Sequence, residues 1–137
     1  MVAQIDLMWT NPLDNMAYFH GPWFVTQGGD ELAHMTTTPF YQREAFISTI
    51  QDTNPLLSIV GRCCVLEMQD YKSMRPTNYE ETDVYICESV YDESRRQIGQ
   101  LPPTGLKTYE HISLDVQADE VYYFKSQITV HKVSNIL

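Results

Sequence analysis

The stretch from Ala17 to Val25 limits the possible folds of this chain more than any other part of it. It reads Ala-Tyr-Phe-His-Gly-Pro-Trp-Phe-Val and contains no Asp, Glu, Lys or Arg. Aromatic and β-branched residues favour the pleated, half-buried surface of a β-strand. The pair Gly21-Pro22 interrupts the run, and proline inside a strand pattern is found at sheet edges and bulges. The sequence therefore predicts an aromatic strand over residues 16–25, with a kink just before Trp23.

Trp23 has two roles that the sequence leaves open. Large aromatic residues are most often part of a core. A tryptophan also keeps one N–H donor, so it is common at the boundary of a core or on a binding surface. Trp23 is therefore interpreted either as a core residue or as one wall of a recognition groove.

Short strands separated by turns are expected along the rest of the chain. Residues 1–10 show a mostly alternating apolar pattern, and the turn residues at 11–15 return the chain into the aromatic strand. Further strands are predicted at 40–48, at 56–66 with a bend at Gly61, at 84–91, at 121–124 and at 128–130. The segments between them are expected to be a loop at 52–55, one helical turn within 67–74, an acidic loop at 75–83 and a polar turn at 92–96. This pattern indicates a mainly β domain whose longest helix has no more than about two to three turns.

The charge of the chain narrows its possible partners. Its 137 residues suit one domain, and they carry 18 acidic against 9 basic side chains, for a net charge of −9. Sequence-independent binding to nucleic acid requires Lys and Arg to neutralise phosphates, so binding to naked DNA should be weak or absent. A basic partner such as a histone tail fits better, although a solvated acidic surface is the commoner meaning of such a charge. No apolar run has the length of a membrane span.

The three cysteines and four histidines form no recognisable metal-binding or catalytic motif. Cys63, Cys64 and Cys87 include no C-x-x-C pair, and the histidines are scattered. The cysteines lie in apolar, strand-like surroundings, which predicts reduced thiols in the cytosol or nucleus. We expect Cys63 and Cys87 to be mostly buried and Cys64 to face the opposite side from Cys63, because neighbouring strand residues alternate.

Sequence motifs of an enzyme are also missing. There is no phosphate-binding glycine loop and no nucleophile elbow. The carboxylates Glu80, Glu81 and Asp83 lie in a loop-like run, where a solvated face is commoner than a catalytic pair. The prediction is that the chain is not an enzyme. A hydrolase or transferase whose cysteine meets a histidine only in the folded chain remains an alternative.

Several residue strings, taken in order, resemble one family. They are Ile5-x-x-Met8-Trp9, Gly21-Pro22-Trp23-Phe24, Phe40 to Ser48, Ile59 to Leu66, Arg75-Pro76-Thr77, Cys87 to Asp92, Gly105-Leu106-Lys107 and Asp119 to Phe124. Together they resemble the bromo-adjacent homology (BAH) domain, in particular the polybromo type of SWI/SNF chromatin remodelling complexes. The resemblance implies a twisted, partly barrel-like β-sheet with long loops and short helical turns. It also implies a nuclear, non-enzymatic interaction module that needs no cofactor and whose partners are remodelling-complex subunits, histones or nucleosomes.

The chain departs from the family pattern in two places. Family domains usually begin with a Gly-Asp-x-Val strand before the Ile-x-x-Met-Trp string, so residues 1–137 are expected to form a single BAH-like domain without that first strand. Readers of methyl-lysine in this family use an aromatic cage. At the corresponding positions this chain offers Met1, Trp23, Ser48 and Thr49, of which only Trp23 is aromatic.

The sequence thus predicts a binding surface centred on aromatic residues. Its proposed members are Trp23, Phe24, Trp9 and Tyr18, with Glu80, Glu81 and Asp83 steering a basic partner. The leading hypothesis is a protein–protein interaction module of a chromatin remodelling complex that takes part in transcription regulation. The alternative is a reader of histone tails, of methyl-lysine or of nucleosomes that uses the aromatic surface around Trp23.

Overall fold

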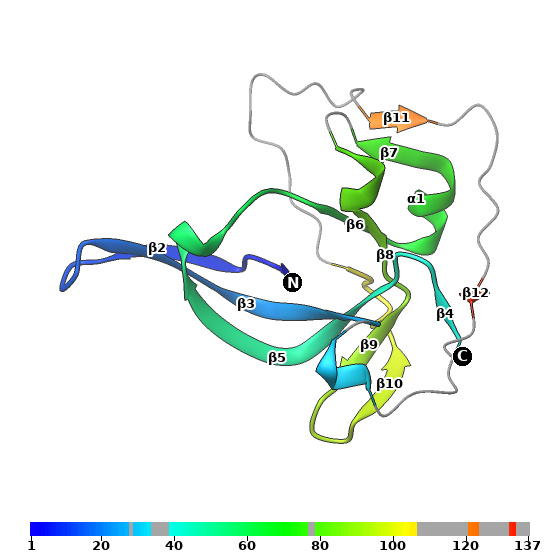
Figure 1. Cartoon of the computed structure of the whole chain (residues 1–137), viewed down its shortest axis with the longest axis horizontal. Coiled ribbons are helices and arrows are strands. Elements are labelled where there is room, and N and C mark those ends of the chain that lie inside the picture. Colours follow the sequence, from blue (N-terminus) through cyan, green and yellow to red (C-terminus); the bar gives the residue numbers. More distant parts are fainter. Residues whose placement is uncertain (28, 34–38, 77–78, 107–120, 124–131, 134–137) are drawn as a thin grey trace.

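The strand β3 (Met16–Thr26) is the element on which the described architecture is built (Figure 1). The structure is a computed structural model that describes residues 1–27, 29–33, 39–76, 79–106, 121–123 and 132–133. Along one edge, β3 pairs with β1 (Val2–Ala3) and β2 (Leu7–Asn11), and along the other with β5 (Ala45–Pro55), all antiparallel. Beyond β5 follow β9 (Ser89–Asp92), in parallel, and β10 (Gln97–Gln100), which forms a hairpin with β9.

Shorter elements complete the fold. β6 (Cys64–Leu66) pairs in parallel with β8 (Val84–Ile86), β7 (Met74–Pro76) with β11 (Val121–Tyr123), and β4 (Phe40–Tyr41) with β12 (Lys132–Val133). The helical elements are α1 (Met68–Ser73) and three 3₁₀ turns, η1 (Asp30–Leu32), η2 (Leu56–Ser58) and η3 (Glu81–Asp83). The mainly β prediction is confirmed, with a twisted mixed sheet that is not closed into a barrel. The longest described helix, α1, has 6 residues, as expected from the sequence. No described helix has the length and apolar character needed to cross a membrane.

The kink predicted at Gly21-Pro22 is present as a shift in the β3–β5 register between Pro22 and Phe24. On the other edge of β3, the pairing with β1 gives way to that with β2 near this point, because β1 pairs with Trp23 and Phe24 whereas β2 pairs with residues 16–20. Between the two strands, the backbone N–H groups of Gln4 and Asp6 donate to the carbonyls of Pro22 and His20 at 3.0 and 2.9 Å, so the N-terminal segment stays close alongside β3 past Gly21. The register shift with β5 and the change from β1 to β2 thus fall at the same point of β3, on its two edges.

The core lies on both faces of β5. Phe46 packs in one cluster with Val25, Leu32, Phe40 and Tyr91, and its ring meets that of Phe40 edge-on with centroids 5.5 Å apart. Its neighbour Ala45 packs in a second cluster with Val2, Phe24 and Cys87. A third cluster, formed by Tyr71, Val84 and Ile86, joins α1 to β8. Alternate residues of one strand thus bind the two sides of the molecule together.

Three sequence-based element predictions were wrong. Residues 56–66 do not form one buried strand: they begin with η2, continue as an exposed loop and become β6 only at Cys64. The expected loop at 52–55 is instead the end of β5, since these residues pair with Tyr18 to Gly21. The strand at 84–91 is divided into β8 and β9. The predicted strand at 128–130 lies outside the described residues.

The close approach at Gly21 generates a stability prediction. A Cβ atom at Gly21 would collide with the backbone carbonyl oxygen of Gln4, whereas one at Gly99 in β10 would meet nothing within 4 Å. Because backbone cannot rotate away as a side chain can, Gly21→Ala should lower the free energy of unfolding by about 2–3 kcal/mol. Gly99→Ala is the matched control and should change it by less than about 1 kcal/mol. Urea denaturation followed by tryptophan fluorescence measures both, and equal stabilities of the two variants would contradict this close approach.

Candidate functional site

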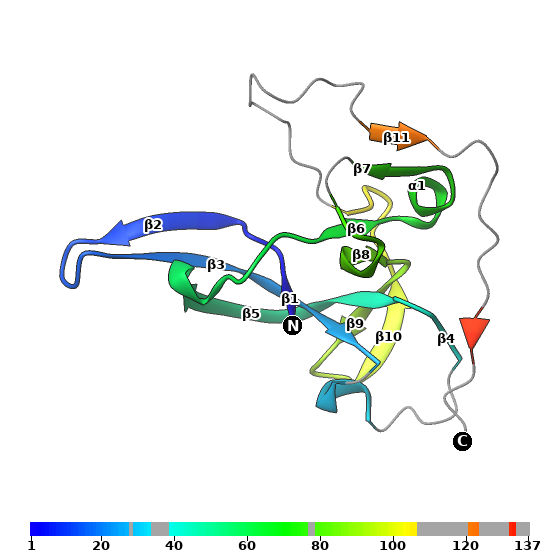
Figure 2. The same cartoon turned by 45° about the horizontal axis from the view of Figure 1, so that its top comes forward.

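The β2–β3 hairpin and its neighbours project from the rest of the molecule in both views (Figures 1 and 2). We call this projection the arm; it comprises residues 7–20, the end of β5 at 52–55 and the segment 56–60 that begins with η2. Trp9, Tyr18 and Pro55 stand in register across its three strands. The rings of Trp9 and Tyr18 stack with centroids 6.1 Å apart and planes 23° from parallel. The arm therefore presents two stacked aromatic rings, with Pro55 beside Tyr18 on the third strand.

Exposed apolar side chains gather on the arm. Among the described residues, every large exposed hydrophobic side chain except Met1 belongs to it, namely Leu7, Met8, Trp9, Leu13, Met16, Leu57, Ile59 and Val60. Leu13, at the hairpin tip, is 93% exposed and Leu57 is 87% exposed. The exposed residues of the hairpin and those of the segment 56–60 belong to the same projection, because η2 contacts β3. Single exposed apolar residues are normal on a protein surface, but a concentration on one element marks an interaction site.

The arm carries acidic side chains but neither Lys nor Arg, and its one histidine, His20, is bonded to Thr53. Within residues 1–61 the only Lys or Arg is Arg43, which lies outside the arm, before β5. Asp14 in the hairpin turn accepts a hydrogen bond from the Tyr18 hydroxyl, which lowers the pKa of its carboxyl. Asp52 accepts from the indole of Trp23, which likewise lowers its pKa. Both carboxylates are therefore charged at neutral pH, and the arm is negative.

Trp23 sits at the base of the arm, between the core and the surface. Its side chain is half-buried, and its indole Nε1–H donates to Asp52 Oδ2 at 3.1 Å. Its carbonyl oxygen accepts the hydroxyl of Ser48 at 2.7 Å, which fixes the bulged backbone. One part of the ring therefore remains accessible beside a carboxylate.

Phe24 does not join this surface. Its side chain is only 8% exposed and packs with Val2, Ala45 and Cys87 in the core. The sequence interpretation treated Trp23 and Phe24 as one aromatic patch, but neighbouring strand residues point to opposite faces. Phe24 is therefore left out of any surface discussed below.

The acidic residues Glu80, Glu81 and Asp83 are exposed and lie before and within η3, which leads into β8. The β2–β3 hairpin extends away from the β6–β8 pair (Figure 1). Glu81 is bound to Arg75, whose Nη2 and Nε lie 2.9 and 3.1 Å from its Oε1. The structure therefore does not bring the predicted acidic residues together with the predicted aromatic residues.

The guanidinium of Arg75 contacts a carboxylate, an aromatic ring and a backbone carbonyl. The side chain is 8% exposed, and the group stacks 4.0 Å from the centroid of the Tyr71 ring while donating to the Tyr71 carbonyl oxygen. The side chain of Glu81, which is 64% exposed, binds the guanidinium of Arg75 on its solvent side. The role of Glu81 shown here is to hold Arg75 between α1 and η3.

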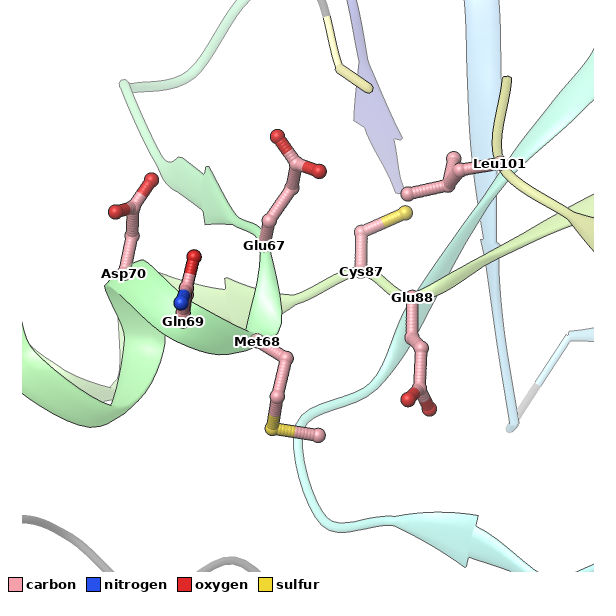
Figure 3. A pocket seen from close by; sticks show the side chains of 7 residues that line it. All are labelled: Glu67, Met68, Gln69, Asp70, Cys87, Glu88 and Leu101. Atoms are coloured by element: carbon pink, nitrogen blue, oxygen red, sulfur yellow. The ribbon is translucent and has the colours of Figure 1, made fainter. Parts of the chain in front are cut away.

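A hollow of about 380 Å³ is lined by Glu67, Met68, Gln69, Asp70, Cys87, Glu88 and Leu101 (Figure 3). Its carboxylates do not converge: Glu67 and Asp70 point to one side and Glu88 to the other. Burial raises the pKa of the Cys87 thiol to about 11, so this thiol stays protonated at neutral pH. The described lining holds no histidine that could act as a base, and no described cluster of three or more His, Cys, Asp or Glu could bind a metal ion.

The cysteine predictions are confirmed in part. Cys87 is fully buried, whereas Cys63 is only partly buried. Cys63 packs against the cluster of Phe24 and Cys87, and Cys64 against the cluster of Tyr71 and Ile86, so the two face opposite sides as expected. All three are free thiols.

Most of the exposed apolar residues of the arm were missed by the sequence reasoning. Leu13 was treated as part of a turn, and residues 57–60 as part of a buried strand. The absence of any Lys or Arg from residues 1–42 and 44–61 was an available signal, because a solvated surface normally mixes both charges. The apolar residue Leu13 inside the polar turn at 11–15 was a second available signal.

Comparisons with known proteins give one family. The family model of the BAH domain matches residues 1–102. The whole chain is similar to the chromatin structure-remodeling complex subunit rsc1 of Schizosaccharomyces pombe, with 27% identity over 137 residues, which make up 16% of that protein. It is also similar to the subunit RSC2 of Saccharomyces cerevisiae, with 23% identity over 135 residues, 93% of this chain and 15% of that protein.

Two further matches are shorter or structural. A stretch of 66 residues, 47% of this chain, is 32% identical to 5% of a probable histone-lysine N-methyltransferase, lin-59, of Caenorhabditis elegans. The crystal structure of the yeast Rsc2 BAH domain superimposes with a TM-score of 0.62 and 23% identity, covering 73% of this chain and 42% of that one. This last match shows that the two share a fold.

The environment of Arg75 leads to a prediction about stability. Arg75→Lys keeps the charge but loses the planar fork that binds Glu81 and stacks on Tyr71, and it should cost about 2–3 kcal/mol of unfolding free energy. The control is Arg95→Lys, because Arg95 meets Asp92 at 3.8 Å on the surface with its side chain 77% exposed. That change should be close to neutral. Thermal unfolding measures both, and a neutral Arg75→Lys would show that the guanidinium geometry does not matter.

Proposed function

Because the chain belongs to the BAH domain family, we propose that it is a non-enzymatic protein–protein interaction module of a SWI/SNF-type chromatin remodelling complex, which takes part in transcription regulation in the nucleus. Two relatives, rsc1 and RSC2, are by name subunits of chromatin structure-remodeling complexes, and the chain spans 16% and 15% of their lengths. These names support the assignment to a complex of this type. The observation that carries the interaction role is the exposed apolar and aromatic surface of the arm.

The arm has the composition of a docking surface. Leu7, Met8 and Trp9 follow one another along β2 and are 62%, 63% and 41% exposed. Apolar area of this kind gains free energy when a partner covers it, at roughly 25 cal/mol per Å² of apolar surface removed from water. Stacked aromatic rings such as Trp9 and Tyr18 resemble the anchors that dominate protein interfaces. We therefore propose Trp9, Tyr18 and the accessible edge of Trp23 as the centre of the surface.

The chemistry of the remaining side chains favours binding over catalysis. The hollow near Cys87 combines a protonated thiol with carboxylates that point apart. A nucleophile needs a base that takes its proton or a depressed pKa. The pKa of the Cys87 thiol is raised instead, and its Sγ–H donates to the carbonyl of Ser89. The similarity to a probable methyltransferase covers 5% of that protein and gives no support for catalysis here.

A histone-tail or methyl-lysine reader is the second candidate function. It is favoured by one observation: the half-buried ring of Trp23 lies beside the charged Asp52, a combination that suits a cation. The other positions of a family cage supply no ring. Ser48 is buried and bonded to the Trp23 carbonyl, and Thr49 accepts the backbone N–H of Glu93 at 3.0 Å.

The main proposal predicts that the arm is needed for assembly. Trp9→Ala removes an exposed ring and should weaken subunit binding by at least ~2 kcal/mol if it is an anchor. Affinity purification of the tagged protein, followed by quantitative mass spectrometry, should then recover less of at least one other complex subunit. Gln97→Ala, at an exposed position of β10, is the control and should recover the normal set.

Two further readouts complete this test. The melting temperature of Trp9→Ala must match that of the control, so that unfolding does not explain a loss. The unaltered domain should not bind naked DNA tightly at physiological salt, because its net charge is −9. Normal recovery of all subunits by a folded Trp9→Ala would reject the arm as the docking surface.

The second candidate predicts a preference for one methylation state. If Trp23 reads the modification, titration with unmodified and lysine-trimethylated histone peptides should show affinities that differ by tenfold or more. With one ring available, we expect less than about threefold, because a cage needs several rings around the ammonium. A strong preference that Trp23→Phe reduces and Trp23→Ala abolishes would favour the reader instead.

A further inference from the structure

Arg43 carries two buried nitrogen atoms whose hydrogen-bonding capacity is not met. Its guanidinium lies over the ring of Tyr85, with the Cζ atom 4.4 Å from the ring centroid. The Nε and Nη2 atoms are buried and have no hydrogen-bond partner in the part of the chain that the structure describes. A guanidinium keeps its charge and all five N–H donors at neutral pH, so each buried donor without an acceptor costs free energy. A ligand that brings an acceptor would remove this cost.

Arg75 shows what Arg43 lacks. Its guanidinium also stacks on a tyrosine ring, with the Cζ atom 4.0 Å from the centroid of Tyr71. There the Nε and Nη2 atoms donate to Oε1 of Glu81 at 3.1 and 2.9 Å. Both arginines are therefore stacked in the same manner, but only in Arg75 does the edge formed by Nε and Nη2 meet an oxygen atom. Arg43 has the donor fork of an arginine site without the acceptor that completes it.

The backbone of Arg43 adopts a conformation that is uncommon for a large side chain. Its φ is 68°, in the left-handed region. Hydrogen bonds hold the turn around it: the carbonyl of Arg43 accepts the N–H of Ile86 at 3.0 Å, and that of Tyr41 accepts the N–H of Glu44 at 3.1 Å. Conformations of this kind occur at ligand sites, where the surrounding contacts offset their cost. The backbone of Arg43 is thus an observation independent of its unpaired nitrogens.

Arg43 lines a hollow of about 240 Å³ between the end of β3, the turn from β4 to β5, and β8. The other lining residues are Thr26, Gln27, Tyr41, Glu44 and Tyr85, and each of their side chains carries an oxygen atom. Pockets for drug-sized ligands measure roughly 300–1,000 Å³. The smaller hollow suits one polar side chain of a partner protein better than a cofactor.

The surrounding charges indicate that the missing acceptor is neutral. Glu44, which is 6% exposed, places a carboxylate in the same hollow, and Glu88 is hydrogen-bonded to the hydroxyl of Tyr41. A further carboxylate would be repelled by both of these groups, whereas an uncharged carbonyl oxygen would not. Arg43 therefore lacks an acceptor rather than a negative charge.

We propose that this hollow binds the side-chain carboxamide of an Asn or Gln residue of another protein. Its carbonyl oxygen accepts from Nε and Nη2 of Arg43, after a rotation of the guanidinium that breaks no hydrogen bond of these two atoms. Its NH₂ group donates to the hydroxyl oxygens of Thr26 and Tyr85. The strand β4 and the tip of the β2–β3 hairpin lie at opposite sides of the molecule in both views, so this contact is separate from the arm (Figures 1 and 2). The inference rests on the proposed interaction role only where it assigns the amide to a partner protein.

NMR signals of the arginine side chains test the hollow directly. The probe is propionamide, which is titrated into the whole chain while the Nε–Hε signals of Arg43 and Arg75 are followed. We expect a saturable shift of the Arg43 signal and a shift at least fivefold smaller for Arg75, because Glu81 already occupies its donors. If the Arg43 signal shows no saturable shift, the proposal is wrong.

Two analogues of the probe identify the chemical group. Propionate should bind at least fivefold more weakly than propionamide, because Glu44 and Glu88 repel it. Butanone has a similar shape and a carbonyl oxygen but no N–H donor, and it should bind at least threefold more weakly. Propionate binding as tightly as propionamide would overturn the neutral acceptor, and equal binding of butanone would overturn the assignment of an amide.

The variant Arg43→Lys separates a ligand site from a structural role. Lysine keeps the charge but not the fork, so propionamide should bind at least tenfold more weakly. The matched control is Arg95→Lys, whose native side chain is 77% exposed, and it should bind the probe normally. Since Nε and Nη2 of Arg43 make no hydrogen bond within the described chain, Arg43→Lys should change the melting temperature by less than about 3 °C. A decrease as large as that of Arg75→Lys would show that Arg43 is structural and would overturn the proposal.

Recovery of complex subunits tests the source of the amide. The tagged Arg43→Lys protein should recover less of at least one subunit than Arg95→Lys does, whereas Trp9→Ala should still bind propionamide. Normal recovery by Arg43→Lys would overturn the assignment to a partner protein. Normal recovery by Trp9→Ala rejects the arm as the docking surface and leaves the result for Arg43 unaffected, so the two proposals fail separately.

Discussion

The close contact of the Gln4 backbone with Gly21 is the constraint on which the rest of the structure depends. A side chain at Gly21 would occupy the position of the Gln4 carbonyl oxygen. Because none is present, the N-terminal segment can run close along β3 and pair first with Trp23 and Phe24 and then with residues 16–20. The first pairing buries Val2 in the core, and the second builds the arm. One glycine thus connects the stability of the domain to the surface that it presents.

The arm owes its shape to polar contacts rather than to burial. In the hairpin turn, the Asn11 side chain accepts the N–H of Leu13 at 2.9 Å, and Asn15 adopts a left-handed φ of 57°. Asparagine tolerates this conformation, so the turn needs no apolar packing and leaves Leu13 in solvent. Along the strands, His20 and Thr53 bond across the sheet at 2.8 Å. The apolar side chains of the arm therefore contribute little to folding and remain available for a partner.

The sequence was sufficient for features with a local cause and insufficient for those set by tertiary contacts. The hairpin turn and the bulge at Gly21-Pro22 follow from turn residues and from the geometry of proline. The strand at 52–55 could not be foreseen, because Asp-Thr-Asn-Pro is a loop composition and is extended here by pairing with β3. The run at 56–66 was assigned to a buried strand because it is apolar, although apolar runs without a period are ambiguous. Of the expected site, only the hairpin that places Trp9 opposite Tyr18 follows from the turn residues at 11–15, whereas the burial of Phe24 and the position of Glu80 beside β8 depend on how the strands fold together.

The distribution of cations explains why the arm, rather than η3, should attract a basic partner. Eight of the nine Lys and Arg residues follow position 61. Several are used internally: Arg75 holds Glu81, and Arg62 lies 5.6 Å from the centroid of the Tyr79 ring. The carboxylates near η3 therefore have cations close by, which reduces the field that they project. The arm contains no Lys or Arg, so at physiological salt, where screening acts over roughly 8 Å, a basic segment close to Asp14 and Asp52 would be attracted to both carboxylates. Whether nearby cations neutralise the carboxylates, and not the number of acidic residues, therefore decides which surface attracts a basic partner.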